Sequence, residues 1–234
     1  MLTKNVVLAS YFNANKDPQR NIYWDNDYSL LLPLINSVTQ HGIEIIIFHD
    51  CFTDLPTIDK CRWEKVEQIN SYVPSIVRWF HYLSYLSNTN FDRVFMVDST
   101  DVVMLKNPFD SIKPTQLYIG TEYNNTWRHP YLKNKDRYIH LPDYKDIKNK
   151  SIDEILLNCG VCGGYADIVI DFLTMNTIYH SNTSHNIINV SLDMPVFNYT
   201  LRKHFNDILY IGDKVNTKFK EYEVDNTIAW WKHK

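Results

Sequence analysis

The chain has 234 residues, of which 44% are hydrophobic and 22% charged, and its net charge is −3. This is the composition of a globular protein long enough to form a core of its own. The chain has no excess of basic residues, so we expect neither a nucleic acid nor an anionic membrane as a partner. No apolar run is long enough to cross a bilayer, since the longest are 30–35 and 43–48.

Apolar strands alternate with amphipathic helices along the chain, which predicts an α/β domain with a mainly parallel sheet. We expect strands at 6–12, 44–49, 63–69, 94–97, 117–121 and 208–211. We expect helices at 27–39, 74–87, 166–179 and 193–205. The apolar N-terminal segment has no cleavage-site pattern and is therefore interpreted as the first strand. Residues 122–150 are polar and aromatic, as expected of a long active-site loop or a small insertion.

The strand at 94–97 runs directly into Asp98 and Asp101. Carboxylates at the end of a buried strand are costly to desolvate, and a divalent cation with hard oxygen ligands, Mn²⁺ or Mg²⁺, offsets that cost. Ligands also bind beyond the carboxyl ends of strands in open α/β sheets. The alternative is a turn with an Asx or N-terminal cap, but a cap needs one carboxylate. The pair therefore predicts a metal or nucleotide site.

Three of the six glycines fall close together, at 160, 163 and 164. Such a concentration indicates close backbone approach or positive φ. It predicts either a loop along which a ligand lies, with Gly160 and Gly163 beside it, or a tight turn before the helix at 166–179. The preceding Asn158 carries an amide suited to a sugar hydroxyl.

Two further segments carry candidate side chains. Asp193, two residues before Pro195, is placed to cap a helix and also to act as a general base. The C-terminal Trp-Trp-Lys-His-Lys run is either a hydrophobic anchor or a site segment. In the second interpretation His233 binds a metal and Lys232 a phosphate.

Arg78 precedes the acidic strand on a predicted helix, and Arg20 lies in the loop after the first strand. Each is either a surface arginine or a pyrophosphate ligand. The four cysteines are scattered, and the CxxC at Cys159 and Cys162 lacks the second pair of a zinc site. We therefore expect free thiols and a reducing, cytoplasmic location.

Together these residues resemble the GT-A family of nucleotide-sugar glycosyltransferases. That family has, in order, an arginine on a helix, a strand, an Asp-x-Asp-type metal motif, an Asn-x-Gly-x-x-Gly-type segment, an acidic residue at a helix start and a late histidine. The corresponding positions here are Arg78, 94–97, Asp98 with Asp101, Asn158 with the glycines, Asp193 and His233. The acidic motif departs from the family pattern, because its spacing is Asp-x-x-Asp. The compact size and the segment 17–20 are similar to small glycosyltransferase domains of large DNA viruses.

The resemblance, which covers about residues 5–233, implies one domain with a nucleotide-binding part over 1–110 and an acceptor-side part over 111–234. It implies sugar transfer from a nucleoside-diphosphate sugar, most commonly a UDP-sugar, to a hydroxyl of a glycan or glycoprotein acceptor. For a viral protein the location would be the host cytoplasm.

The resemblance also assigns roles to residues. Asp101 and His233 would bind Mn²⁺ or Mg²⁺, with Asp98 facing the ribose or a metal-bound water. The positive side chains that face the negative diphosphate would be Arg20, Arg78 and Lys232. The sugar and acceptor pocket would be shaped by Glu122, Asn158, Gly160 and Gly163, with aromatic platforms such as Trp127. If the reaction inverts the anomeric centre, Asp193 would be the base.

Two other functions remain open from the sequence. A sugar-phosphate nucleotidyltransferase would have a similar sheet and metal, but such enzymes usually carry a glycine-rich loop after the first strand, and residues 11–21 contain no glycine. A sugar- or nucleotide-binding module without catalytic activity is the other alternative, and it would bind nucleotide without turnover.

Overall fold

The computed structural model describes residues 3–16, 22–69, 71–183, 190–218 and 228–233. Seven strands form one sheet in the order β3-β2-β1-β4-β7-β6-β8. Their bounds are β1 (Asn5–Tyr11), β2 (Glu44–His49), β3 (Cys61–Lys65), β4 (Arg93–Val97), β6 (Leu117–Thr126), β7 (Ile155–Tyr165) and β8 (Leu209–Tyr210). Only β7 is antiparallel to its neighbours, so the sheet is mainly parallel, as predicted.

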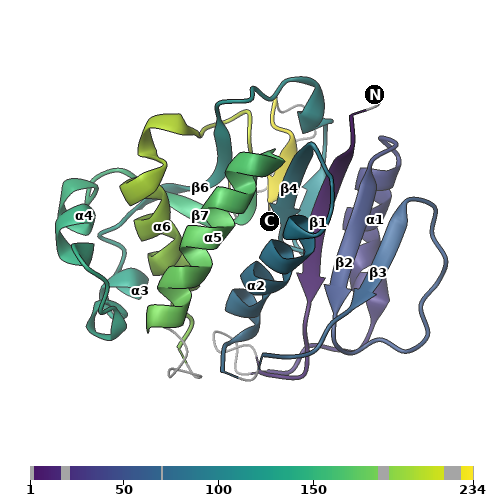
Figure 1. Cartoon of the computed structure of the whole chain (residues 1–234), viewed down its shortest axis with the longest axis horizontal. Coiled ribbons are helices and arrows are strands. Elements are labelled where there is room, and N and C mark those ends of the chain that lie inside the picture. The colour runs from purple at the N-terminus through teal and green to yellow at the C-terminus, as the bar shows by residue number, and fades with distance from the viewer. Residues whose placement is uncertain (1–2, 17–21, 70, 184–189, 219–227, 234) are drawn as a thin grey trace.

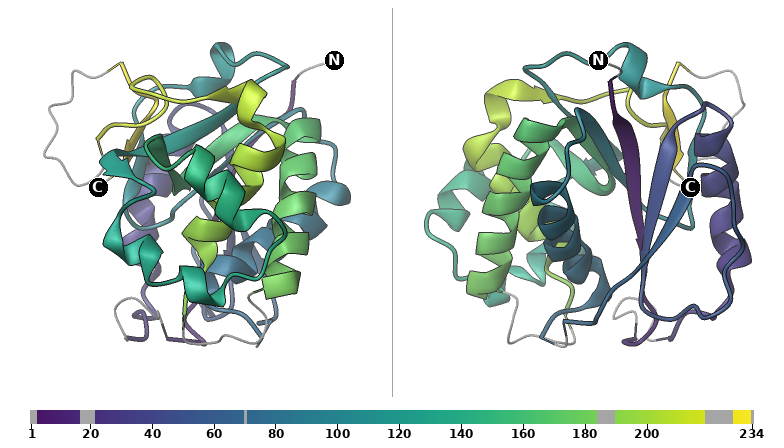
Figure 2. Two further views of the ribbon diagram at one scale, coloured as in Figure 1. Left: turned by 90° about the vertical axis from the view of Figure 1, so that its left-hand side faces the viewer. Right: turned by 45° about the vertical axis from the view of Figure 1, so that its right-hand side comes forward.

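Helices cover both faces of this sheet (Figures 1 and 2). One face carries α2 (Pro74–Ser87), α5 (Ala166–Thr183) and α6 (Asp193–His204), and the other carries α1 (Leu32–Thr39). The smaller helices are η1 (Tyr28–Leu31), η2 (Pro108–Asp110), α3 (Pro130–Lys133), η3 (Asp136–Tyr138), α4 (Tyr144–Lys150) and η4 (Asn206–Ile208). None of the helices in the described part of the chain combines the length and apolar character that a bilayer crossing requires.

The alternation of side chains along the strands explains the two cores. In β1, Val6 and Leu8 pack toward α2, whereas Val7 and Ala9 pack toward α1, and all four are fully buried. A strand buried on both faces must be apolar throughout, which is the pattern that predicted the parallel sheet.

A second, two-stranded ribbon lies on the α1 face of the sheet. It pairs β5 (Val102–Met104) with β9 (Trp231–His233) in antiparallel register. Trp230 and Trp231 are buried against Phe95 of β4, with ring centroids 6.2 and 5.5 Å from it. The hydrophobic-anchor interpretation of the C-terminal tryptophans is therefore confirmed, and this anchor fixes the position of His233.

The predicted loop or turn at the glycine cluster is wrong, and for 122–150 the structure favours the small insertion over the long loop. The glycine cluster is neither a loop nor a turn, because it lies within β7, which sits between β4 and β6 in the sheet. The stretch 122–150 is not a continuous loop, since β6 extends to Thr126 and is followed by α3, η3 and α4. These helices pack through Leu132 and Tyr144 on a third apolar cluster, which also holds Trp127.

The order of the strands marks a position for a site. The chain leaves β1 for β2 on one side and later places β4 on the other side of β1. In open α/β sheets ligands bind beyond the carboxyl ends of the strands at such a switch point. Asp98 follows the last residue of β4 and lies at this edge.

Candidate metal and nucleotide site

Two carboxylates and an imidazole meet at the carboxyl end of β4. Asp98 comes directly after β4, Asp101 comes directly before β5, and His233 pairs with Val102 across the β5–β9 ribbon. The Nε2 atom of His233 lies 3.7 Å from an Asp98 oxygen and 3.9 Å from an Asp101 oxygen. The ribbon thus brings a residue from the end of the chain to the acidic pair predicted from the sequence.

The three side chains are spaced as candidate ligands of one divalent cation. One ligand atom from each residue lies within 4.8 Å of the other two. Ligands about 2.1 Å from one ion lie no more than about 4.2 Å apart, so the two His233 distances already fall in range. The side chains of Asp98 and Asp101 are 32% and 33% exposed, whereas that of His233 is 1% exposed. Carboxylate oxygens are ligands of Mn²⁺ and Mg²⁺, whereas an imidazole is a transition-metal ligand, so this set favours Mn²⁺, and its open side leaves room for a substrate oxygen.

Gly160 on β7 gives the cluster its space. A Cβ atom at this position would lie 2.2 Å from Cε1 of His233 and 2.7 Å from Oδ2 of Asp98. Its carbonyl also accepts the backbone N–H of Asp98 at 2.9 Å, which continues the β4–β7 pairing one step further. Gly160 therefore lies beside the candidate ligands, and its missing side chain makes room for them.

Asn158 and Glu122 extend the site onto β7 and β6. The amide of Asn158 accepts the N–H of Gly160 and donates to a carboxylate oxygen of Glu122, both at 2.5 Å. Both side chains are buried. Because these bonds lead directly from Glu122 to Gly160, both side chains lie beside the three candidate metal ligands.

Arg78 and Asp193 form a buried charge network behind the cluster. The guanidinium of Arg78 donates to Asp98, to an Asp193 oxygen at 2.9 Å and to the carbonyl of Cys159 at 3.3 Å. The second Asp193 oxygen accepts the indole N–H of Trp79 at 2.6 Å. Arg78 and Asp193 are 7% and 6% exposed, so both side chains are committed to this network. The geometry favours Arg78 as the residue that orients Asp98, in place of the predicted pyrophosphate contact.

Asp193 does not cap its helix, which corrects that prediction. It is the first residue of α6, and the position before it is Leu192, without a side-chain cap. The carboxylate points to α2, because the buried guanidinium and indole there need an acceptor. With one hydrogen bond on each oxygen, Asp193 is better placed to position Arg78 than to remove a proton.

Burial and charge act in opposite directions on this network. Burial alone would lower the pKa of Arg78, but Asp98 and Asp193 raise it well above its ordinary value. Burial raises the pKa of Asp193, and Arg78 and Trp79 oppose that change. His180 on α5, 3.9 Å from Asp193, has its pKa lowered to about 3 by burial and by Arg78, so it is neutral at physiological pH.

Lys135, which the sequence did not single out, approaches the same network. It lies between α3 and η3, is 8% exposed, and donates to the carbonyl of Ser191, just before α6. Burial lowers the pKa of Lys135 to about 8, while Asp193 acts to raise it. Trp79 was likewise missed as a site residue. A buried indole needs a hydrogen-bond acceptor, and this need was the available signal for Trp79. No feature of the polar stretch 122–150 distinguished Lys135.

Two predicted residues are not brought into the site, and a third falls on residues that the structure does not describe. Gly163 faces the core, where an added Cβ would lie 2.4 Å from the ring of Phe95. Lys232 precedes His233 in β9, so strand alternation directs its side chain to the opposite face of the ribbon. Arg20 lies outside the described residues.

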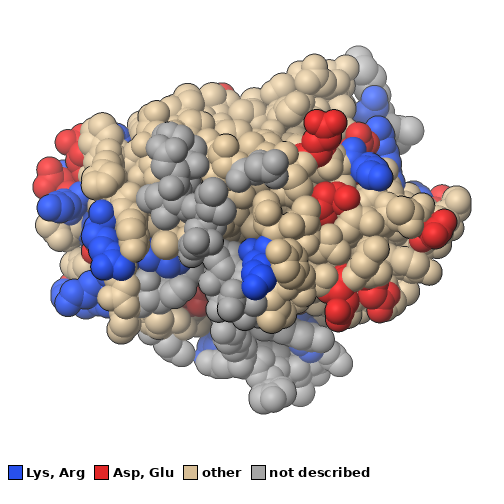
Figure 3. Space-filling model, turned by 90° about the horizontal axis from the view of Figure 1, so that it is seen from below, with Lys and Arg blue, Asp and Glu red and all other residues tan. Residues whose placement is uncertain are grey.

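Figure 3 views the molecule from the side on which the parallel strands end. Lys and Arg side chains gather on the left, over the part with α3 and α4, while Asp and Glu side chains are more prominent on the right.

A comparison with known protein families found no family model that matches the chain, and a comparison with curated proteins found no significant match. The function is therefore argued from the site itself.

Proposed function

We propose that this chain is a metal-dependent glycosyltransferase that takes its sugar from a nucleoside-diphosphate sugar, with UDP the commonest nucleotide of such sites. The observation that carries the proposal is the cluster of Asp98, Asp101 and His233 at the carboxyl end of β4, with Gly160 leaving space beside it. It lies at the switch point of the sheet, where nucleotides bind in this class of fold.

Each part of the site has a task in this proposal. Asp101, Asp98 and His233 would hold Mn²⁺ or Mg²⁺, which when bound neutralises negative charge on a diphosphate leaving group. Arg78 fixes the orientation of Asp98, since its guanidinium bridges Asp98 and Asp193. Glu122 and Asn158 border the space next to Gly160 and would contact hydroxyls of the sugar or the acceptor.

The first experiment is a calorimetric titration with UDP and with GDP, each with and without Mn²⁺. We expect one nucleotide to bind in a metal-dependent manner. Asp101→Asn should weaken that binding by at least about tenfold, because it removes a charged ligand from the ion. Asp110→Asn is the matched control, since Asp110 is an exposed carboxylate on η2 outside the cluster.

Three outcomes decide between functions. Metal-dependent binding with release of the nucleoside diphosphate in the presence of a glycan acceptor supports the transferase. Binding without turnover over a broad acceptor panel favours a sugar- or nucleotide-binding module. If neither nucleotide binds in either condition, or if both variants bind as well as the wild type, the metal role of Asp98 and Asp101 is refuted.

A further inference from the structure

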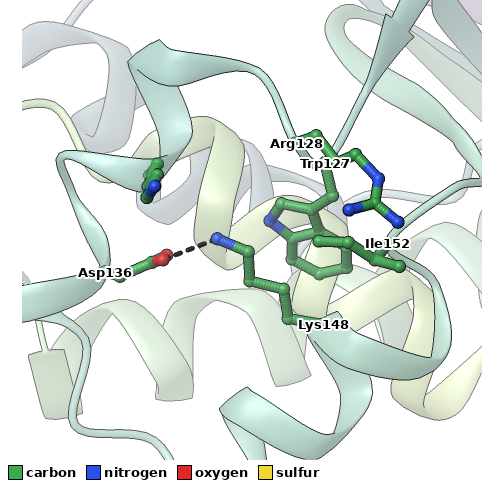
Figure 4. A pocket seen from close by; sticks show the side chains of 6 residues that line it. Trp127, Arg128, Asp136, Lys148 and Ile152 are labelled. Carbon is green, nitrogen blue, oxygen red and sulfur yellow. Dashed lines mark hydrogen bonds and ion pairs between the residues drawn. The ribbon is translucent and has the colours of Figure 1, made fainter.

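A cavity lies away from the candidate metal cluster, between the end of β6 and the small helices that follow it (Figure 4). Its volume is about 270 Å³. The lining residues come from this one part of the chain and are Trp127, Arg128, Lys133, Asp136, Lys148 and Ile152. None of them belongs to the candidate metal and nucleotide site.

Asp136 is the only carboxylate among the lining residues, and both of its oxygens already accept hydrogen bonds. One accepts from the ammonium of Lys148 at 2.6 Å and the other from the hydroxyl of Tyr144 at 3.0 Å. Lys148 is 8% exposed, so its charge is held close to the cavity wall. An ammonium has three N–H donors, and Asp136 takes one of those of Lys148.

Trp127 adds a buried donor. Its side chain is 2% exposed, and its indole nitrogen has no hydrogen-bond partner in the part of the chain that the structure describes. The hydroxyl of Tyr144 lies near this nitrogen but not in the geometry of a hydrogen bond. Its own O–H donates a hydrogen bond to Asp136. In Figure 4 the indole nitrogen points to the side on which Lys148 and Asp136 lie. A buried donor left in this state costs stability, which a bound acceptor would restore.

Two further cations line the cavity. Lys133, in the last turn of α3, has no ion-pair partner among the described residues. Arg128 pairs with Asp153, but those side chains are 64% and 73% exposed. Asp153 takes two of the five N–H donors of this guanidinium in a bidentate pair, so Arg128 keeps further donors for a ligand. Donors and positive charge therefore exceed acceptors and negative charge around this space.

We infer that this cavity is a binding site for a small anionic group, a carboxylate or a phosphate, carried on a sugar or free. Lys133 and Arg128 supply the charge at its rim, and Trp127 and Lys148 supply N–H donors from its wall. A neutral sugar brings no negative charge to set against the lining cations, and the only lining carboxylate already accepts a hydrogen bond on each oxygen. The inference is independent of the proposed function, because the two sites share no residue.

The test titrates the metal-free, full-length protein with inorganic phosphate, glucose 6-phosphate, glucuronate and glucose, followed by amide chemical shifts. We expect the three anions to bind and to shift resonances of 127–152, and we expect no comparable binding of glucose. Lys133→Gln should weaken phosphate binding by about tenfold through loss of a charged hydrogen bond. Tighter binding of glucose 6-phosphate than of phosphate would show that the anion is carried on a sugar.

Two controls keep the test specific. Lys145→Gln removes an exposed charge of α4 that does not line the cavity, and it should leave binding unchanged. Asp101→Asn disables the proposed metal site and should also leave phosphate binding unchanged, so the two proposals fail separately. The inference is refuted if no anion binds at millimolar concentration, if glucose binds equally, or if Lys133→Gln and Lys145→Gln have the same effect.

Discussion

The two aspartates that contact Arg78 differ in burial and in hydrogen bonding. Asp98 is half-buried and open on one side, whereas Asp193 is buried with a hydrogen bond on each oxygen. Removing one partner of a buried pair leaves an uncompensated charge, and that is far more costly than losing an exposed carboxylate. The buried and the half-exposed acids at this site should therefore lose stability to different degrees when they are neutralised.

For Asp193→Asn we expect a loss of about 3 kcal/mol in the free energy of unfolding, which for a chain of this size lowers Tm by about 6–12 °C. The reason is that Arg78 keeps its charge but loses one of its two carboxylates. Thermal unfolding followed by circular dichroism checks this. Asp101→Asn is the comparison and should shift Tm only slightly without metal. Equal stability of both variants would contradict a structural role for Asp193.

The glycines of β7 provide a second contrast at the residue scale. In Gly160→Ala the new methyl would meet His233 and Asp98, at 2.2 and 2.7 Å. We expect the displaced ligands to reduce Mn²⁺ affinity by about 10–100-fold. In Gly163→Ala the methyl would instead meet the Phe95 ring at 2.4 Å and the Val94 carbonyl at 2.6 Å. Such overpacking costs about 1–3 kcal/mol of stability.

Calorimetric Mn²⁺ titration and urea unfolding of both variants separate these effects. Gly160→Ala should lose metal affinity with a smaller loss of stability. Gly163→Ala should lose more stability, and its folded form should keep its metal affinity. A Gly160→Ala protein that binds Mn²⁺ as tightly as the wild type would contradict the placement of Gly160 in the site.

At the scale of elements, a buried lysine links the segment between β6 and β7 to the start of α6. Lys135 donates to the carbonyl of Ser191 at the start of α6, and the hydroxyl of Ser191 lies 3.1 Å from that of Ser75 in α2. The contact holds the segment with α3 and η3 against the helix that carries Asp193. A lysine at such a position makes this connection sensitive to pH.

Since burial lowers the folded-state pKa of Lys135 to about 8, from an ordinary value near 10.4, the unfolded chain binds this proton more tightly. Below about pH 8 the free energy of unfolding therefore gains nothing from this group. It rises by up to about 3 kcal/mol as the pH increases to about 10.5. Lys135→Met should abolish that increment. Urea unfolding of wild type and variant at several pH values in this window measures the difference. Parallel pH profiles would contradict it.

The elements that sequence patterns predicted well are those whose patterns arise locally. The helix at Pro74–Ser87 has the predicted bounds, and the strand before Asp98 begins one residue earlier than predicted. Helix periodicity and continuous apolar runs arise from neighbours along the chain. The strand β7 was missed because its glycines suggested a loop. Their cause is tertiary: Gly160 makes room for His233 and Gly163 for Phe95.

The same distinction holds for the site. The acidic pair was visible because two carboxylates follow a buried strand, and His233 because it stands beside two tryptophans. Arg78 was assigned to a phosphate, since a sequence does not show that the guanidinium lies between Asp98 and Asp193. Lys135 could not be found from the sequence, because its burial depends on how the segment between β6 and β7 packs on α6.

On the scale of the whole molecule, the proposed metal site joins distant parts of the chain. Asp98 and Asp101 flank the end of β4 near the middle of the sequence, and His233 lies at its end, held by the ribbon with β5. An ion that binds all three would link the C-terminal ribbon to the central sheet only in the folded state. Binding of this kind must stabilise the fold by mass action.

We therefore expect Mn²⁺ at about 100 times its dissociation constant to stabilise the protein by about 2.7 kcal/mol, which for a chain of this size raises Tm by about 5–10 °C. Chelation by EDTA should reverse the shift. Asp101→Asn should remove it while leaving the metal-free Tm nearly unchanged, because that carboxylate is 33% exposed. Asp110→Asn should keep it. A Mn²⁺-induced shift of the same size in Asp101→Asn would mean that the ion binds elsewhere, since stabilisation through this cluster requires the ligand set that ties the ribbon to β4.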